Sequence, residues 1–165
     1  NCPPLVVDPV MISTSGAGLL KRSAVKLMQE ELLPLCVLVT PNVPEAEVLV
    51  GHPVRSVKEL RAAAHEIKAR YGCSALVKGG HLRGMKEAVD FFFDGRTELM
   101  LSAPYTGGVH THGTGCTYSA AVAAHLARDL KLPVAVQRAK EYITQAIIRS
   151  RTAGRHSVLN WFGPG

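Results

Sequence analysis

The most restrictive feature of this sequence is a repeated unit in which a short apolar run ends in polar residues and a helical segment follows. The run "PLVVDPV" ends in Asp8-Pro9, the run from Val37 to Val39 leads into a Thr-Pro-Asn turn, and "SALVKGG" ends in Lys78 and two glycines. Such short apolar runs are typical of strands that are buried on both faces of a parallel sheet. The alternation therefore predicts an α/β fold with a mainly parallel sheet flanked by helices.

The segments between these runs have helical periodicity. Helices are predicted before Pro34, up to Gly51, over residues 57–71, from about 115 to 130 and from about 134 to 151. Two strand-like runs around Asp94-Gly95 predict a β-hairpin. No repeat or linker divides the chain, so residues 1–165 are predicted to form a single domain. The chain starts almost directly in a strand without an initiator methionine, so we expect the N-terminal part of the fold to be missing.

Charge and composition limit the class of partner. The formal net charge is +6, but the lysines and arginines are scattered, and no basic stripe with interleaved aromatic residues occurs. This distribution favours a small anionic ligand over nucleic acid. No apolar run approaches the roughly 18 uncharged residues of a membrane span, and nothing resembles a signal peptide. We therefore expect a small-molecule ligand and neither a nucleic-acid nor a membrane partner.

The cysteines and histidines give little sign of a metal site. The four cysteines are far apart and form no CxxC pair: Cys2, Cys36, Cys73 and Cys116. Zinc ribbons and thioredoxin-like chemistry are therefore unsupported, and reduced thiols in a cytoplasmic protein are the simplest interpretation. His110 and His112 form an HxH pair without an evident third ligand. The Phe91-Phe92-Phe93 run is interpreted as sheet packing.

The turn Gly113-Thr114-Gly115-Cys116 is the strongest local candidate for a ligand site. Its glycines allow consecutive N–H groups to converge, and the helix that follows adds the positive end of its dipole, so the turn is suited to an anion. A plain helix cap, with Thr114 or Gly113 as the capping residue, is the alternative. Neither GxxxxGK[ST] nor GxGxxG occurs, so this is not a Walker A or Rossmann loop.

Cys116 begins the predicted helix, where the dipole should favour the thiolate and lower the pKa of the thiol. The thiolate could then accept a proton; the alternative is a small buried residue beneath a helix end. Asn42 and Glu45 are three residues apart at another helix start, so their oxygens could bind a magnesium ion. Alternatively, Glu45 is an acidic residue in a first helical turn, where the positive end of the helix dipole stabilises it. Lys78, at the end of its strand, is a natural phosphate contact.

The ordered motifs "VVDPVM", "TPNVPEAE", "VKGGH" and "HGTGCT" strongly resemble the hydroxymethylpyrimidine phosphate kinases of thiamine biosynthesis, which are ribokinase-like. The similarity extends from about Leu5 to Phe162. It implies an enzyme that uses ATP and Mg²⁺ to phosphorylate 4-amino-5-hydroxymethyl-2-methylpyrimidine and then its monophosphate, giving the pyrophosphate. The partners implied are this pyrimidine, ATP and a second copy of the chain in a homo-oligomer.

The resemblance also implies a role for individual residues. Cys116 is the base in place of an aspartate, and the N–H groups of Gly113, Thr114, Gly115 and Cys116 form the anion hole. The remaining roles are magnesium and phosphate binding by Asp8, Asn42 and Glu45, contact with the nucleotide by Thr40, Asn42, Lys78, Thr114 and Lys140, and a wall of the pyrimidine pocket at Val10.

Two departures from the family and two alternatives accompany this interpretation. The segment that precedes the DPVM strand in the family, and supplies much of its pyrimidine pocket, is absent from this sequence, and the loop "YTGGVHTHGTGC" differs from the family's usual charged approach.

Some relatives with the same cysteine accept pyridoxal or pyridoxine, so a pyridoxal kinase is one alternative. A truncated, non-catalytic nucleotide-binding or structural protein is the other.

Overall fold

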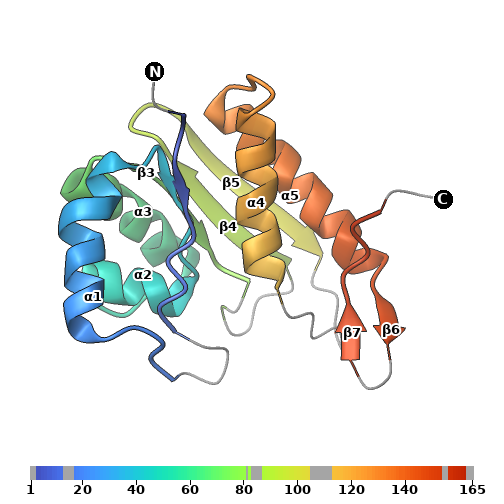
Figure 1. The fold of residues 1–165 in the computed structure, drawn as a ribbon, viewed down its shortest axis with the longest axis horizontal. Coiled ribbons are helices and arrows are strands. Elements are labelled where there is room, and N and C mark those ends of the chain that lie inside the picture. The colour runs from blue at the N-terminus through green and yellow to red at the C-terminus, as the bar shows by residue number, and fades with distance from the viewer. Residues whose placement is uncertain are drawn as a thin grey trace.

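A five-stranded mixed sheet forms the centre of the protein (Figure 1). The computed structural model describes residues 3–12, 17–80, 82, 87–104, 113–153 and 156–162. The sheet has the order β1 (Val6–Val7), β2 (Leu38–Val39), β3 (Ser74–Lys78), β4 (Glu87–Phe93) and β5 (Glu98–Pro104). β1, β2 and β3 pair in parallel, whereas β4 pairs antiparallel with both β3 and β5. The parallel half therefore contains the three strands that were predicted to end in polar residues.

Helices cover both faces of this sheet, as Figure 1 shows. The elements on one side are α1 (Arg22–Leu27) with a π-helical turn over Met28–Leu32 and a 3-10 turn over Leu33–Leu35, α2 (Val43–Val50) and α3 (Val57–Tyr71). On the other side lie α4 (Thr114–Leu126) and α5 (Leu132–Ile148), followed by a small hairpin of β6 (Arg151–Ala153) and β7 (His156–Val158). Within the described ranges, none of the helices is long and apolar enough to cross a membrane.

Successive side chains of β3 and β4 point alternately to the two faces of the sheet, and each face carries its own core cluster. Ala75, Val77 and Phe91 belong to the core cluster beneath α2 and α3. Leu76 and Phe92 belong to the cluster beneath α4 and α5. Successive side chains of a strand point to opposite faces, so residues two positions away from Leu76 and Phe92 also face α4 and α5. This register brings the polar ends of the strands under the start of α4.

The predicted α/β architecture is confirmed, with differences where the sequence signal is weak. The helix over residues 57–71 and the hairpin around Asp94-Gly95 form as predicted, and Phe92 is fully buried within the sheet packing. The sheet is more evenly mixed than predicted, because the hairpin strands extend the same sheet. α4 ends before Asp129, whose φ of 61° leaves the helical region. The β6–β7 hairpin was not predicted because three-residue strands are too short for a recognisable alternation.

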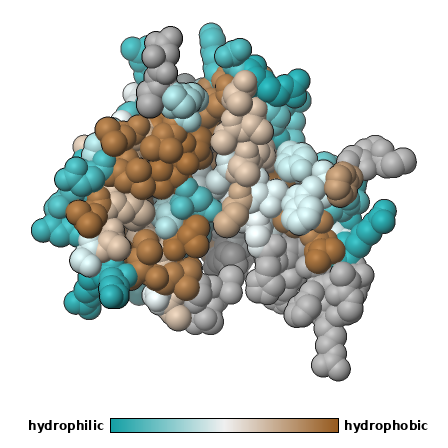
Figure 2. Space-filling view, in the orientation of Figure 1, coloured by the Kyte–Doolittle hydropathy of each residue, from teal (hydrophilic) through white to brown (hydrophobic). Residues whose placement is uncertain are grey.

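Apolar side chains are exposed around the β1 edge of the sheet (Figure 2). α1 buries none of its residues, and Leu27 and Leu35 are 60% and 74% exposed. Leu5, Leu19 and Leu20 are also exposed. These exposed side chains form an apolar surface at this edge of the sheet. Association of two copies remains a prediction.

Candidate active site

Polar residues at the carboxyl ends of β1, β2 and β3 meet on the face that α4 covers. Lys78 Nζ lies 3.0 Å from Asp8 Oδ1, and both side chains are largely buried, with 13% and 17% of their surface exposed. The Thr40 hydroxyl lies 3.4 Å from the same carboxylate oxygen and 3.4 Å from the carbonyl of Val7. The structure therefore brings Asp8, Thr40 and Lys78 together, as parallel strand ends should.

The first turn of α4 lies directly over Lys78. Gly113 is the N-cap residue and adopts a left-handed φ of 84°, which favours glycine. The first helical hydrogen bond runs from the Thr117 N–H to the Gly113 carbonyl, so the amides of Gly115 and Cys116 lie at the dipole's positive end. A Cβ on Gly115 would lie only 3.1 Å from Lys78 Nζ. The glycine at this position thus allows the ammonium group to approach the helix start.

Ser119 connects the strand ends to this helix and was not identified from the sequence. Its hydroxyl lies 2.7 Å from the Thr40 hydroxyl and donates to the Gly115 carbonyl at 3.0 Å. Thr40 is buried, with 1% of its surface exposed, so its hydroxyl contacts protein groups such as Ser119 and Asp8. The only sequence signal is the spacing, because Ser119 follows Gly115 by one helical turn.

Asn42 and Glu45 form a capping box at the start of α2. The Asn42 side chain accepts from the Glu45 N–H, and Glu45 Oε2 accepts from the Asn42 N–H at 2.9 Å. Glu45 Oε1 accepts from the Met11 N–H at 3.1 Å, so the buried carboxylate also holds the segment after Asp8. Burial raises the pKa of Glu45. Asn42 and Glu45 therefore hold the start of α2, and Glu45 also holds the backbone at Met11, three residues after Asp8.

Val10 occupies an unusual backbone conformation in the segment that Glu45 holds. Its φ is 43°, a region in which a β-branched residue is an outlier, and 44% of its surface is exposed. Strain of this kind persists where surrounding contacts fix the backbone, and the Met11–Glu45 hydrogen bond is one such contact. Val10 is thus presented at the surface beside Asp8.

Cys116 is exposed at the start of α4, whereas Cys36 and Cys73 are buried. The prediction that its pKa is lowered is wrong. Partial burial raises the pKa of the Cys116 thiol, and a hydrogen bond with Asp8 and the negative charge of that carboxylate raise it further. The opposing effect of Lys78 is smaller. Burial and the neighbouring Asp8 carboxylate thus raise the pKa of this thiol although it lies at a helix start.

This geometry predicts the pH dependence of Cys116 alkylation. Because the pKa is raised, the rate with iodoacetamide should still increase in the pH range where ordinary cysteines have already ionised. Asp8→Asn should move the midpoint to lower pH, since the amide removes the charge that disfavours the thiolate. The rate is measured by mass spectrometry in a Cys2→Ser background. An unchanged midpoint in Asp8→Asn would show that Asp8 does not control this thiol.

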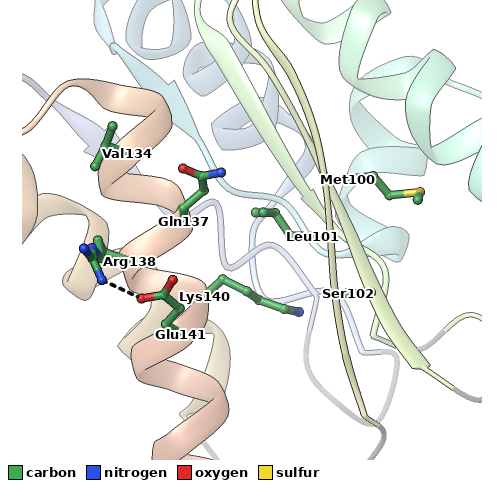
Figure 3. Close-up of a pocket in the computed structure, with 8 residues that line it drawn as sticks. All are labelled: Met100, Leu101, Ser102, Val134, Gln137, Arg138, Lys140 and Glu141. Atoms are coloured by element: carbon green, nitrogen blue, oxygen red, sulfur yellow. Dashed lines mark hydrogen bonds and ion pairs between the residues drawn. The ribbon is translucent and has the colours of Figure 1, made fainter.

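Lys140 does not join the cluster at the end of β3. Its side chain extends from α5 toward the sheet beside a cavity of about 550 Å³ between α5 and β5 (Figure 3). The ammonium group donates to Asp90 Oδ2 at 2.7 Å and to the Ala88 carbonyl at 3.4 Å. Asp90 was not identified from the sequence, where its only signal is an acid inside the apolar run "AVDFFF". His110 and His112 lie outside the described residues.

Comparison with known proteins shows the family of this chain. The family described as phosphomethylpyrimidine kinase matches residues 1–160. The hydroxymethylpyrimidine/phosphomethylpyrimidine kinase of Rhizobium meliloti is 49% identical, over 86% of this chain and 53% of its own length. The enzyme of the same name from Aquifex aeolicus is 39% identical, over 92% of this chain and 59% of its own length.

Solved structures share the same fold. Phosphomethylpyrimidine kinase from Clostridium difficile has a TM-score of 0.75 at 38% identity, covering 87% of this chain and 57% of its own. The ADP complex of Bacillus subtilis pyridoxal kinase has a TM-score of 0.81 at 33% identity, covering 93% and 57%. The chain thus spans little more than half the length of these relatives. Fold, matched family and strand-end residues agree, and this chain belongs to the ribokinase-like phosphomethylpyrimidine kinase family.

Proposed function

We propose that the protein containing this chain transfers the γ-phosphoryl group of ATP to the hydroxymethyl group of 4-amino-5-hydroxymethyl-2-methylpyrimidine. A second transfer to the monophosphate then gives the pyrophosphate used in thiamine biosynthesis. The observation that carries the proposal is the position of the Lys78 ammonium beneath the start of α4, next to the exposed Cys116. A cytoplasmic location, where ATP is available as the donor, is part of the proposal.

The start of α4 and Lys78 would bind the group in transfer. Phosphoryl transfer has a loose transition state, so catalysis depends on positioning and on stabilising negative charge. The amides of Gly113, Thr114, Gly115 and Cys116 and the helix dipole supply a cradle for that charge. Lys78 adds a positive charge beside Gly115, and Thr114 would lie along the nucleotide phosphates.

Cys116 is the proposed base. As the substrate oxygen bonds to the γ-phosphorus, the hydroxyl proton passes to the Cys116 thiolate, and the bond from that phosphorus to the bridging oxygen breaks to release ADP. The raised pKa makes the thiolate scarce at neutral pH but a stronger proton acceptor. A loose transition state needs little basic assistance before the new bond forms, so a minor thiolate population is compatible with this role.

The acidic residues fit a hydrated magnesium ion better than one held directly by all three predicted ligands. Both Glu45 oxygens accept backbone N–H groups, and the Asn42 side-chain oxygen accepts another. The described residues contain no group of three or more His, Cys, Asp or Glu side chains able to hold a metal. Asp8 would hold the ion, with Asn42 and Glu45 acting through water or backbone. Bound Mg²⁺ would neutralise phosphate charge.

The remaining predicted residues would position the site. Thr40 would act through Asp8 and Ser119, because its hydroxyl is buried between them. Val10, exposed and strained beside Asp8, would contribute a wall of the pyrimidine pocket. Assembly as a homo-oligomer is part of the same proposal. No nucleic-acid or membrane partner is included in it.

A pyridoxal kinase is the second candidate, because the Bacillus subtilis pyridoxal kinase is 33% identical to this chain. The test measures kcat/KM of the natural full-length protein with MgATP and each alcohol. We expect at least a tenfold preference for the hydroxymethylpyrimidine, an order-of-magnitude value for discrimination by pocket shape. Equal or greater values with pyridoxine would reverse the substrate assignment. Absence of MgATP binding by calorimetry, in folded protein, would support the non-catalytic alternative.

Substitution of the proposed base tests the mechanism. Cys116→Ala should lower kcat by about 10²-fold, the lower end for general base catalysis, with little change in KM for ATP. Iodoacetamide should inactivate the enzyme through the same residue, because it is the exposed cysteine of the described three. Undiminished phosphorylation by Cys116→Ala would remove the thiol from the mechanism.

A further inference from the structure

A buried ion pair between Lys140 and Asp90 lies next to the active-site residue Lys78. Lys78 and Asp90 are direct partners in the antiparallel register of β3 and β4. Two positions earlier in this register, Leu76 opposes Phe92, and both belong to the core beneath α4 and α5. Lys78 and Asp90 therefore face the same side of the sheet as neighbours. Lys78 thus stands between two carboxylates, those of Asp8 and Asp90.

Asp90 is fully engaged by other groups. Lys140 Nζ donates to Oδ2 at 2.7 Å, and the Gly79 N–H donates to Oδ1 at 3.0 Å. The pair is more deeply buried than Lys78–Asp8, with side-chain exposures of 11% for Lys140 and 6% for Asp90. Gly79 directly follows Lys78, so the carboxylate fixes the backbone from which the Lys78 side chain extends. Asp90 therefore links α5 to the active-site end of β3.

Without the ion pair to Lys140, the negative charge of Asp90 would compete with that of Asp8 for the Lys78 ammonium group. Opposite charges on directly opposed residues of neighbouring strands attract, and a buried carboxylate that lacks a partner attracts strongly. Burial raises the pKa of Asp90, and Lys140, the Gly79 amide and, least of all, the charge of Lys78 oppose this effect. Burial raises the pKa of the nearby Tyr118 phenol, and the charge of Asp90 raises it further. Among these groups, Lys140 is the cation in hydrogen-bond contact with Asp90.

We propose that Lys140 is a positioning residue. It neutralises Asp90, so that Asp90 holds the Gly79 amide while the Lys78 ammonium remains with Asp8 at the start of α4. The consequence for phosphoryl transfer rests on the proposed function, whereas the consequence for the Gly79 amide does not. Lys140 therefore affects the nucleotide through Asp90 and Lys78.

The test compares Lys140→Met, Asp90→Asn with Lys140→Met, and Lys131→Met in the natural full-length protein. Lys140→Met leaves Asp90 unpaired, so Lys78 should turn toward it and the affinity for an ATP analogue should fall about tenfold. The double variant buries no unpaired charge and keeps an oxygen acceptor for Gly79, so affinity should return to within about threefold of wild type. Lys131→Met, at the exposed start of the same helix, should have no effect.

The amide resonance of Gly79 provides a readout independent of activity. It should shift in Lys140→Met and return toward its wild-type position in the double variant, because the hydrogen bond to residue 90 is altered and then restored. A merely structural role would lower the free energy of unfolding and leave ATP affinity per folded molecule unchanged. That result, or a double variant as weak as the single one, would overturn the proposal. A wild-type protein without kinase activity would refute the proposed function, while the Gly79 resonance would still test the pair.

Discussion

Lys78→Met should lower kcat/KM for phosphorylation by about 10³-fold, with the folded state retained. Methionine keeps most of the length and apolar volume of the lysine side chain but removes the ammonium group 3.0 Å from Asp8. One preorganised charge donor at a transition state is worth about 10²–10³ in rate, and a cation on a transferring phosphoryl group more. Steady-state kinetics of the full-length protein measure the loss, and circular dichroism checks the fold.

Two further variants show whether this loss depends on the position of the charge. Lys78→Arg should recover little activity, because the site beside Gly115 has no room for a planar guanidinium where a Cβ would already lie 3.1 Å from Nζ. Lys26→Met removes an exposed lysine that pairs with Glu30 at 3.8 Å and should leave kinetics unchanged. Wild-type kcat/KM in Lys78→Met would place the transferred group away from the start of α4.

The position of Lys78 also illustrates which part of the site the sequence could predict. Asp8, Thr40 and Lys78 each follow an apolar run, and the carboxyl ends of parallel strands lie at one edge of a sheet. The order of runs and helices was therefore enough to predict that these three residues meet. The turn from Gly113 to Cys116 could be added because its glycines and the helix after it carry their own local signal.

The residues that the sequence did not predict depend on packing between distant segments. Asp90 acquires its role from the strand register with Lys78 and from α5, 50 residues later in the chain. Ser119 depends on contact with Thr40, 79 positions away. The pKa of Cys116 was predicted from the helix start alone, whereas partial burial raises it and Asp8, from another part of the chain, raises it further. Side-chain chemistry of this kind has no periodicity or spacing that a single sequence reveals.

Gly79→Ala should destabilise the protein by about 3 kcal/mol, within the upper range for overpacking a tightly packed site. A Cβ at this position would lie 2.2 Å from the Val89 carbonyl oxygen and 2.9 Å from Leu60 Cδ2. The carbonyl belongs to β4 and cannot turn aside as a flexible side chain would. β3 and β4 must therefore separate locally, which also disturbs the hydrogen bond from Gly79 to Asp90. Urea unfolding of the full-length protein measures the change.

The neighbouring glycine supplies the matched control for this prediction. A Cβ on Gly80 would meet only the Ala88 Cβ, at 3.8 Å, which is an ordinary van der Waals contact. Gly80→Ala should therefore change the free energy of unfolding by no more than about 0.5 kcal/mol, as a substitution without a steric conflict does. Equal stability of the two variants would mean that β4 does not approach the backbone after Lys78 closely. Because Asp90 can hold the Gly79 amide only at such an approach, that result would also argue against the link between the buried ion pair and the active site.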